Sequence, residues 1–237
     1  PELKNEEGAP GRCVGFLDTS STVEKTSLVI VAEDPRSSQP WEHVYVSYLE
    51  FWWPGHNCGR IIPDAEVRRA IESLLPLYPS LEEFQIDTRA GGKRDPEYLW
   101  PTIMMRELRA GAGMWRRKLK VWQGAQDGSN DDGWDILIER VLSETIRLPF
   151  SQEILEEVKG ITLKRAGDQR AKVTDRNRNL MHRDITQSIA CCCYMAKRLG
   201  ERARRKSSLA DMVRRTSAVS SSAPSSKVFG RLGPNSF

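Results

Sequence analysis

Three segments near the start of the chain have the pattern of β-strands: two alternate with a period of two, and the one between them is a continuous run. Val14 and Phe16 stand on either side of Gly15, residues 26–31 are apolar or β-branched apart from Ser27, and residues 43–51 alternate. Alternation of this kind predicts half-buried β-strands. Prolines between the segments break the runs into turns, so we expect three short strands in an antiparallel meander.

Apolar residues recur every three or four positions after residue 60, which is the spacing of one helix face. Val67, Ile71 and Leu74 form such a face before a break at Pro76. Similar spacings predict further helices over 95–111, 134–148 and 151–160. The longest regular pattern covers 175–206 and predicts a single long helix.

Two short segments are less regular. Ser80 and Glu83 have the spacing of a helix capping box, although the segment that they would start ends within a few residues. Residues 115–122 fit a helix and a strand equally well. The chain is therefore predicted to be an α+β protein with one domain, divided into a flexible N-terminus (1–12), a small antiparallel β section (13–60), a mainly helical section packed on it and ending in the long helix (61–206), and a flexible, basic, serine-rich tail (207–237).

The composition is that of an ordinary globular protein. The 237 residues are 39% hydrophobic and 29% charged, and no apolar run approaches the length of a membrane span. The first residues are charged and show no secretory signal. Five cysteines, three of them consecutive and none in a C-x-x-C pair, fit a reducing compartment, so we expect an intracellular protein, cytoplasmic or nuclear.

The net charge of +4 conceals a strong segregation of charge along the chain. Residues 127–157 contain nine acidic residues against two basic ones, and residues 159–183 contain eight basic residues against two acidic ones. Residues 197–237 add ten basic residues against two acidic ones. This pattern favours a polyanionic partner, and it suggests a homo-oligomer in which the acidic 127–157 and basic 159–183 patches of different copies meet.

Basic residues interleaved with aromatic ones form the main candidate binding site. Cations that hold phosphates beside rings that stack on bases are what single-stranded nucleic acid binding requires. The first cluster comprises Lys93, Arg94, Arg106, Arg109, Arg116, Arg117, Lys118 and Lys120 with Trp115 and Trp122. The second comprises Lys164, Arg165, Arg170, Lys172, Arg176, Arg178 and Arg183. A solvated helix face with tryptophans in the core is the alternative interpretation.

Enzyme motifs are sparse. The chain lacks glycine-rich phosphate loops, a G-x-S-x-G serine and an H-E-x-x-H pair, so we predict no catalytic residue, no cofactor and no metal site. One set of carboxylates and a lysine, of the kind that a metal-dependent nuclease uses, is present in scattered form: Asp64, Glu82 or Glu83, Asp87 and Lys93.

Two further features allow modification. The cysteine triplet, residues 191–193, lies on the long predicted helix, where three successive positions cannot all face one core. Lipidation of an outward cysteine beside the basic tail would give a membrane anchor, and buried reduced thiols are the alternative. Basic residues precede four candidate phosphorylation sites, Ser207, Ser208, Thr216 and Ser217.

The leading hypothesis from the sequence is a non-enzymatic nucleic-acid-binding structural protein that favours RNA over DNA and self-assembles through the charged patches. In composition, though in no particular motif, the chain resembles viral nucleocapsid, coat and matrix proteins. The alternative is a matrix or adaptor protein bound to an anionic membrane or to another protein, and the third hypothesis is a metal-dependent nuclease.

Overall fold

A computed structural model gives the fold of the chain. It describes residues 11–19, 25–88, 100–111, 113–122, 129–164, 172–175 and 184–221. The residues up to Gly200 form one compact unit, and Glu201–Phe237 form a second that is considered separately.

Three antiparallel strands open the first unit, as the alternation predicts. They are β1 (Cys13–Asp18), β2 (Thr26–Glu33) and β3 (Val44–Trp52). Val14 and Phe16 of β1 point to one side of the sheet and belong to one buried apolar cluster. Cys13 and Leu17 point to the other side and belong to a second cluster. The sheet is therefore covered on both faces.

The prediction that the sheet ends with this meander, ahead of a mainly helical body, is wrong. Three later strands extend it: β4 (Leu81–Ile86) pairs with β1, β5 (Leu119–Val121) pairs with β4, and β6 (Ile146–Arg147) pairs with β3, all in parallel. The result is a six-stranded mixed sheet in the order β5-β4-β1-β2-β3-β6. The capping-box spacing suggested a helix, but the segment is a strand because burial of its apolar residues outweighs the local signal. Leu81, Phe84 and Ile86 all belong to the same buried cluster.

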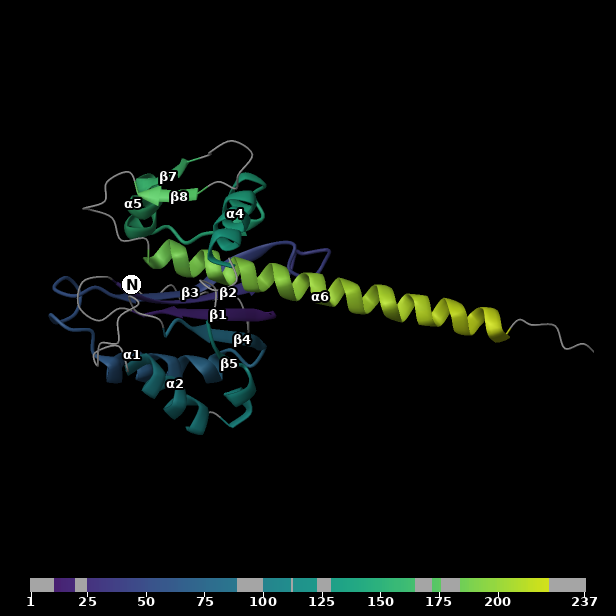
Figure 1. Ribbon diagram of the computed structural model, residues 1–237, viewed down its shortest axis with the longest axis horizontal. Helices are drawn as coiled ribbons and strands as arrows, with labels where there is room; N and C mark the ends of the chain where they lie inside the picture. The colour runs from purple at the N-terminus through teal and green to yellow at the C-terminus, as the bar shows by residue number, and fades with distance from the viewer. Residues whose placement is uncertain are drawn as a thin grey trace, which may run out of the picture. The chain divides into compact units, whose positions relative to one another are not determined.

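Helices cover the two faces of this sheet (Figure 1). One face carries α1 (Asp64–Leu74), the short helix η1 (Leu75–Leu77) and α2 (Trp100–Gly111), which the short helix η3 (Gly113–Arg117) connects to β5. The first part of α6 (Asp184–Ser221) lies on the other face, with α4 (Ser129–Leu142) and α5 (Gln152–Gly160) beyond it. A small antiparallel pair, β7 (Ile161–Lys164) and β8 (Lys172–Asp175), follows α5.

The segment of α6 that contains the three cysteines is enclosed on all sides. Cys191, Cys192 and Cys193 are at most 1% exposed, and α4 packs so close that a Cβ on Gly133 would lie 2.9 Å from the carbonyl oxygen of Ala190. Burial raises the pKa of the Cys193 thiol to about 12. The expectation that one of the three must leave the core is wrong, because the helix is covered by the sheet and by α4, and buried thiols are inaccessible to lipidation.

A buried carboxylate ties α6 to the outer strands. Glu83 of β4 is 2% exposed and accepts hydrogen bonds from Lys120 Nζ, at 2.6 Å, and from Arg198 and Gln85. Burial tends to raise the pKa of Glu83, but these hydrogen bonds and the two cations outweigh it and leave that pKa lowered. Position 198 of α6 is therefore fixed against the edge of the sheet.

Ile189 tests whether α6 belongs to the core. The side chain is fully buried between β-strands and α4, so Ile189→Ala should reduce the free energy of unfolding by about 2–5 kcal/mol. Leu209→Ala, at a position of the same helix that is 65% exposed, should change it by less than about 0.5 kcal/mol. Chemical denaturation measures both, and equal effects would show that Ile189 does not face the core.

Candidate active site

Two carboxylates emerge side by side where β1 and β4 end. Asp18 is the last residue of β1, and Asp87 directly follows β4. The strands run parallel with Leu17 opposite Ile86, and the Asp87 N–H donates to the Leu17 carbonyl oxygen at 2.9 Å. Thr19 Oγ1 donates to the carbonyl oxygen of Asp87 at 2.5 Å. These bonds hold the two aspartates as neighbours across the strand pair.

Both aspartates face α6. Because side chains alternate along a strand, Asp18 points to the same side as Phe16, which belongs to the apolar cluster around α6. Ile86 packs on the side of the sheet that carries α1 and α2. The next residue, Asp87, therefore points to the other side, toward α6. Burial raises the pKa of Cys191 well above its usual value, and the Asp18 and Asp87 carboxylates raise it further, as expected for two anions near this part of α6.

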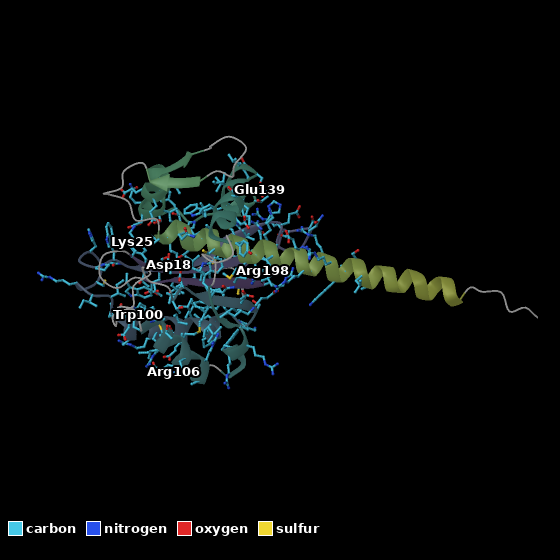
Figure 2. The ribbon with its side chains drawn as sticks, viewed as in Figure 1. Asp18, Lys25, Trp100, Arg106, Glu139 and Arg198 are labelled. Atoms are coloured by element: carbon cyan, nitrogen blue, oxygen red, sulfur yellow. The ribbon has the colours of Figure 1, made fainter. Side chains whose placement is uncertain are left out.

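A third aspartate lies at the start of α6. Ser27 pairs with Asp18 across β1 and β2, and its hydroxyl donates to the carbonyl oxygen of Asp184 at 2.8 Å. The Ser27 and Ser188 hydroxyl oxygens lie 2.6 Å apart. Asp184 Oδ2 accepts the backbone N–H of Lys25 at 2.8 Å. The first turn of α6 is thus fixed at the edge of the sheet that carries Asp18, and Figure 2 shows Asp18 and Lys25 near the beginning of α6, with Arg198 farther along it.

The donor set fits a hard divalent cation. Mg²⁺ and Mn²⁺ prefer carboxylate oxygens, and Mg²⁺ usually takes only one or two of them from the protein and fills its other positions with water or phosphate. Asp18 and Asp87 provide two such groups, both partly accessible to solvent. Within the described ranges, no three His, Cys, Asp or Glu side chains converge closely enough to form a complete metal cage, so Asp184 is an adjacent group rather than part of a closed set.

Part of the basic cluster predicted around β5 is engaged in contacts within the protein. Lys118 Nζ lies 4.5 Å from the centre of the Trp115 ring, Lys120 binds Glu83, and Arg109 Nη2 donates to the Leu119 carbonyl oxygen at 2.8 Å. These residues stabilise α2, η3 and β5. Among the described basic residues of the cluster, Arg106, Arg116 and Arg117 are exposed and take no part in these contacts, and Lys120 is exposed although it binds Glu83.

The arginines of η3 precede β5, and Asp87 lies just beyond the end of its neighbour β4. Since β5 runs parallel to β4, Arg116 and Arg117 lie at the opposite end of the strands from the Asp18–Asp87 pair. Figure 2 places Arg106 on the far side of the sheet from α6.

The two tryptophans expected to stack on bases pack against other side chains of the protein. Trp122 is 2% exposed and packs edge-on against Phe16 and Tyr194, with ring centroids 5.2 Å and 5.9 Å away. Trp115 is half-buried and packs against the cluster of α1 and α2. The alternative interpretation of a core tryptophan therefore describes Trp122.

Most of the remaining predicted binding residues are not placed. Lys93, Arg94, Arg165, Arg170, Arg176, Arg178 and Arg183 lie outside the described residues, as do the side chains of Lys164 in β7 and Lys172 in β8. Of the phosphorylation candidates, Ser207 and Ser208 are exposed on α6. Thr216 and Ser217 belong to the same helix, and their side chains are outside the described set.

The nuclease hypothesis named one residue of this site and missed two. Asp64 is exposed in the first turn of α1, Glu82 lies 3.7 Å from Arg12, Glu83 binds Lys120 and Arg198, and Lys93 is not described. Only Asp87 belongs to the carboxylate pair. The signal that could have found Asp18 is an acid at the end of an apolar strand, repeated in Phe16-Leu-Asp18 and Gln85-Ile-Asp87. Asp184 gave no comparable signal.

By sequence, no protein-family model and no curated protein matches the chain. The fold does match solved structures. The large terminase nuclease of thermophilic phage G20c superposes with a TM-score of 0.50 and 14% identity over 80% of this chain and 89% of that one. The same nuclease with bound magnesium gives a TM-score of 0.50, 13% identity and the same coverage.

The bacteriophage HK97 large terminase gives a TM-score of 0.58 and 14% identity over 81% of this chain and 41% of that one, so this chain spans about two fifths of its length. The six-stranded mixed sheet with helices on both faces is therefore the fold of these terminase nucleases.

This fold overturns the leading hypothesis from the sequence. The solved proteins that share the fold include terminase nucleases. They contradict a non-enzymatic structural protein of the nucleocapsid or coat kind, the matrix or adaptor alternative and the expected absence of an enzyme. Nucleic acid as the partner class is supported. A preference for RNA, self-association through 127–157 and 159–183, and an anionic membrane partner gain no support. In the described residues, no helix is both long and apolar enough to cross a membrane.

The carboxylate pair predicts a metal-dependent thermal shift. At a Mg²⁺ concentration tenfold above its Kd, binding should raise the wild-type midpoint by about 3–6 °C. Asp18→Asn should melt at or slightly above the wild-type midpoint without metal, because it removes one of two neighbouring like charges, and should not respond to Mg²⁺. Differential scanning fluorimetry measures this, and an undiminished shift in the variant would exclude Asp18 as a ligand.

Proposed function

We propose that the protein is a metal-dependent nuclease that hydrolyses phosphodiester bonds of DNA, with Asp18 and Asp87 holding the cation. The observation that carries the proposal is the placement of these two carboxylates at the ends of neighbouring parallel strands, beside the start of α6. In open sheets, ligands bind at the carboxyl ends of parallel strands. The likeness to terminase nucleases, one of them with bound magnesium, supports the same chemistry.

A divalent cation bound here would polarise a phosphate oxygen and lower the pKa of a bound water, which makes hydroxide available near neutral pH. The protein supplies the rest. Asp18 and Asp87 would hold the cation as hard oxygen ligands, and the bonds from Asp87 N–H and Thr19 Oγ1 fix the strand ends that carry them. Asp184 adds a third negative charge at the same edge, held through the Lys25 N–H.

The solved structures that share the fold are named as terminase nucleases, and the choice of DNA over RNA as the substrate is part of this proposal. The exposed arginines Arg106, Arg116 and Arg117 remain candidates for phosphate contacts away from the scissile bond. Lys120 binds Glu83 and is a weaker candidate for such a contact.

Cleavage of supercoiled plasmid DNA tests the proposal. The wild-type protein should nick or linearise the plasmid in Mg²⁺ or Mn²⁺ and stop in EDTA. Asp18→Asn and Asp87→Asn should each lower the rate by more than about a hundredfold, since even groups that only orient a metal ligand cost 10–100-fold when lost.

Asp64→Asn is the matched control for charge. It removes an exposed carboxylate from the first turn of α1, on the other face of the sheet, and should retain the wild-type rate within about twofold. Full activity of Asp18→Asn with an intact fold, or a loss in Asp64→Asn equal to that in Asp18→Asn, would contradict the assignment. A single-stranded RNA of matched length, cleaved faster than DNA under the same conditions, would contradict the substrate.

A further inference from the structure

Lys25 is a buried lysine whose backbone N–H binds the candidate site and whose side chain binds α5. It directly precedes β2, and its N–H donates to Asp184 Oδ2 at 2.8 Å. Its Nζ donates to Glu157 Oε1 at the same distance, with the lysine side chain 6% exposed and the glutamate side chain 2% exposed. One residue thus links the third aspartate of the site to α5.

The other oxygen of Glu157 binds the first turn of α6. Glu157 Oε2 accepts the backbone N–H of Thr186 at 2.9 Å and the Thr186 hydroxyl at 3.0 Å. The first N–H groups of a helix have no partner within it, and its N-terminus favours negative charge. Glu157 therefore caps α6 from α5, two residues beyond Asp184.

The four contacts close a ring around the Asp184 turn. Lys25 binds Asp184 directly, and it binds Thr186 through Glu157. The lysine is further confined by the rings of Trp53 and Phe51, whose centres lie 4.7 Å and 5.8 Å from Nζ. Each group in the ring has little freedom to turn away.

Stability alone does not account for this pair. Taking two charges out of water costs several kcal/mol per ion, and a well-packed apolar pair of similar volume is often at least as stabilising. Trp53 and Phe51 already provide apolar surroundings at this position. What charged groups add over apolar ones is direction, because hydrogen bonds fix the relative placement of the elements that they join.

We propose that the Lys25–Glu157 ion pair is a positioning element for Asp184, which sets where this carboxylate lies relative to Asp18 and Asp87 when a cation binds. The inference rests on the proposed nuclease function, since only a metal site makes the exact placement of Asp184 matter. Lys25 and Glu157 are positioning residues: the bonds described above lead from them to Asp184 and Thr186, not to the Asp18–Asp87 pair.

Mn²⁺ binding to the full chain, measured by electron paramagnetic resonance of the free ion, tests this without relying on catalysis. Glu157→Gln and Lys25→Met should each weaken Mn²⁺ binding by about tenfold or more. The double variant should be little worse than either single one, because the two residues act as a unit. Thr186→Val removes only the hydroxyl donor and should fold more readily than Glu157→Gln. Its Mn²⁺ affinity should also fall, but by less.

Glu83→Gln is the matched control. It also removes a buried carboxylate that ties α6 to the rest of the fold, but it acts at Arg198, about four turns away along the helix. Its Mn²⁺ affinity should stay within twofold of wild type even if its thermal midpoint falls as far as that of Glu157→Gln. Equal losses of affinity in both variants would reduce Glu157 to a general structural role and overturn the inference.

The outcomes separate the inference from the function on which it rests. If wild type binds Mn²⁺, Asp18→Asn does not, and Glu157→Gln binds like wild type, the positioning role is wrong and the metal site stands. If Asp18→Asn binds Mn²⁺ as wild type does, the site itself is wrong, and the positioning role falls with it.

Discussion

The parallel pairing of β4 with β1 is the contact on which the candidate site depends. It brings together two segments separated by the meander and α1, and it does so in a register that sets Leu17 opposite Ile86. Because the strands run in the same direction, both end at the same edge, where Asp18 follows Leu17 and Asp87 follows Ile86. A shift of one residue in this register would turn Asp87 to the other face of the sheet, away from α6.

The α6 helix is the second requirement, since it encloses the carboxylates from one side and carries Asp184. Two buried carboxylates hold the helix at points far apart along it: Glu157 near its start and Glu83 at Arg198. Between them the helix is held by apolar contact, with Ile189 and Cys192 fully buried. Polar groups thus set the position of the helix along the sheet, while apolar burial supplies most of the energy that holds it there.

The sequence pattern predicts local structure better than it predicts pairing. The meander and α1 follow from period and breaker residues, and the structure has them. The parallel strands do not follow, because β4 is a six-residue segment whose polar positions, Glu83 and Gln85, are buried by partners far along the chain.

The site shows the same division. Asp87 could be singled out as an acid in a nuclease-like set, but its partner is chosen by strand register, and Asp184 is brought in by the docking of a helix that begins about a hundred residues later. Conversely, the basic and aromatic residues around β5 were conspicuous in the sequence because they are close together, and the fold uses Lys120 and Trp122 internally. When long-range strand pairing brings the residues of a site together, residues that are close in sequence need not be the ones that form it.

The measurement that tests the central claim most directly is the anomalous diffraction of a crystal soaked in Mn²⁺. If Asp18 and Asp87 form the metal site, an anomalous peak will lie about 2 Å from a carboxylate oxygen of each, on the α6 side of the sheet. Strong peaks at other acidic residues, with the space between Asp18 and Asp87 empty while β1 and β4 remain paired, would contradict the account.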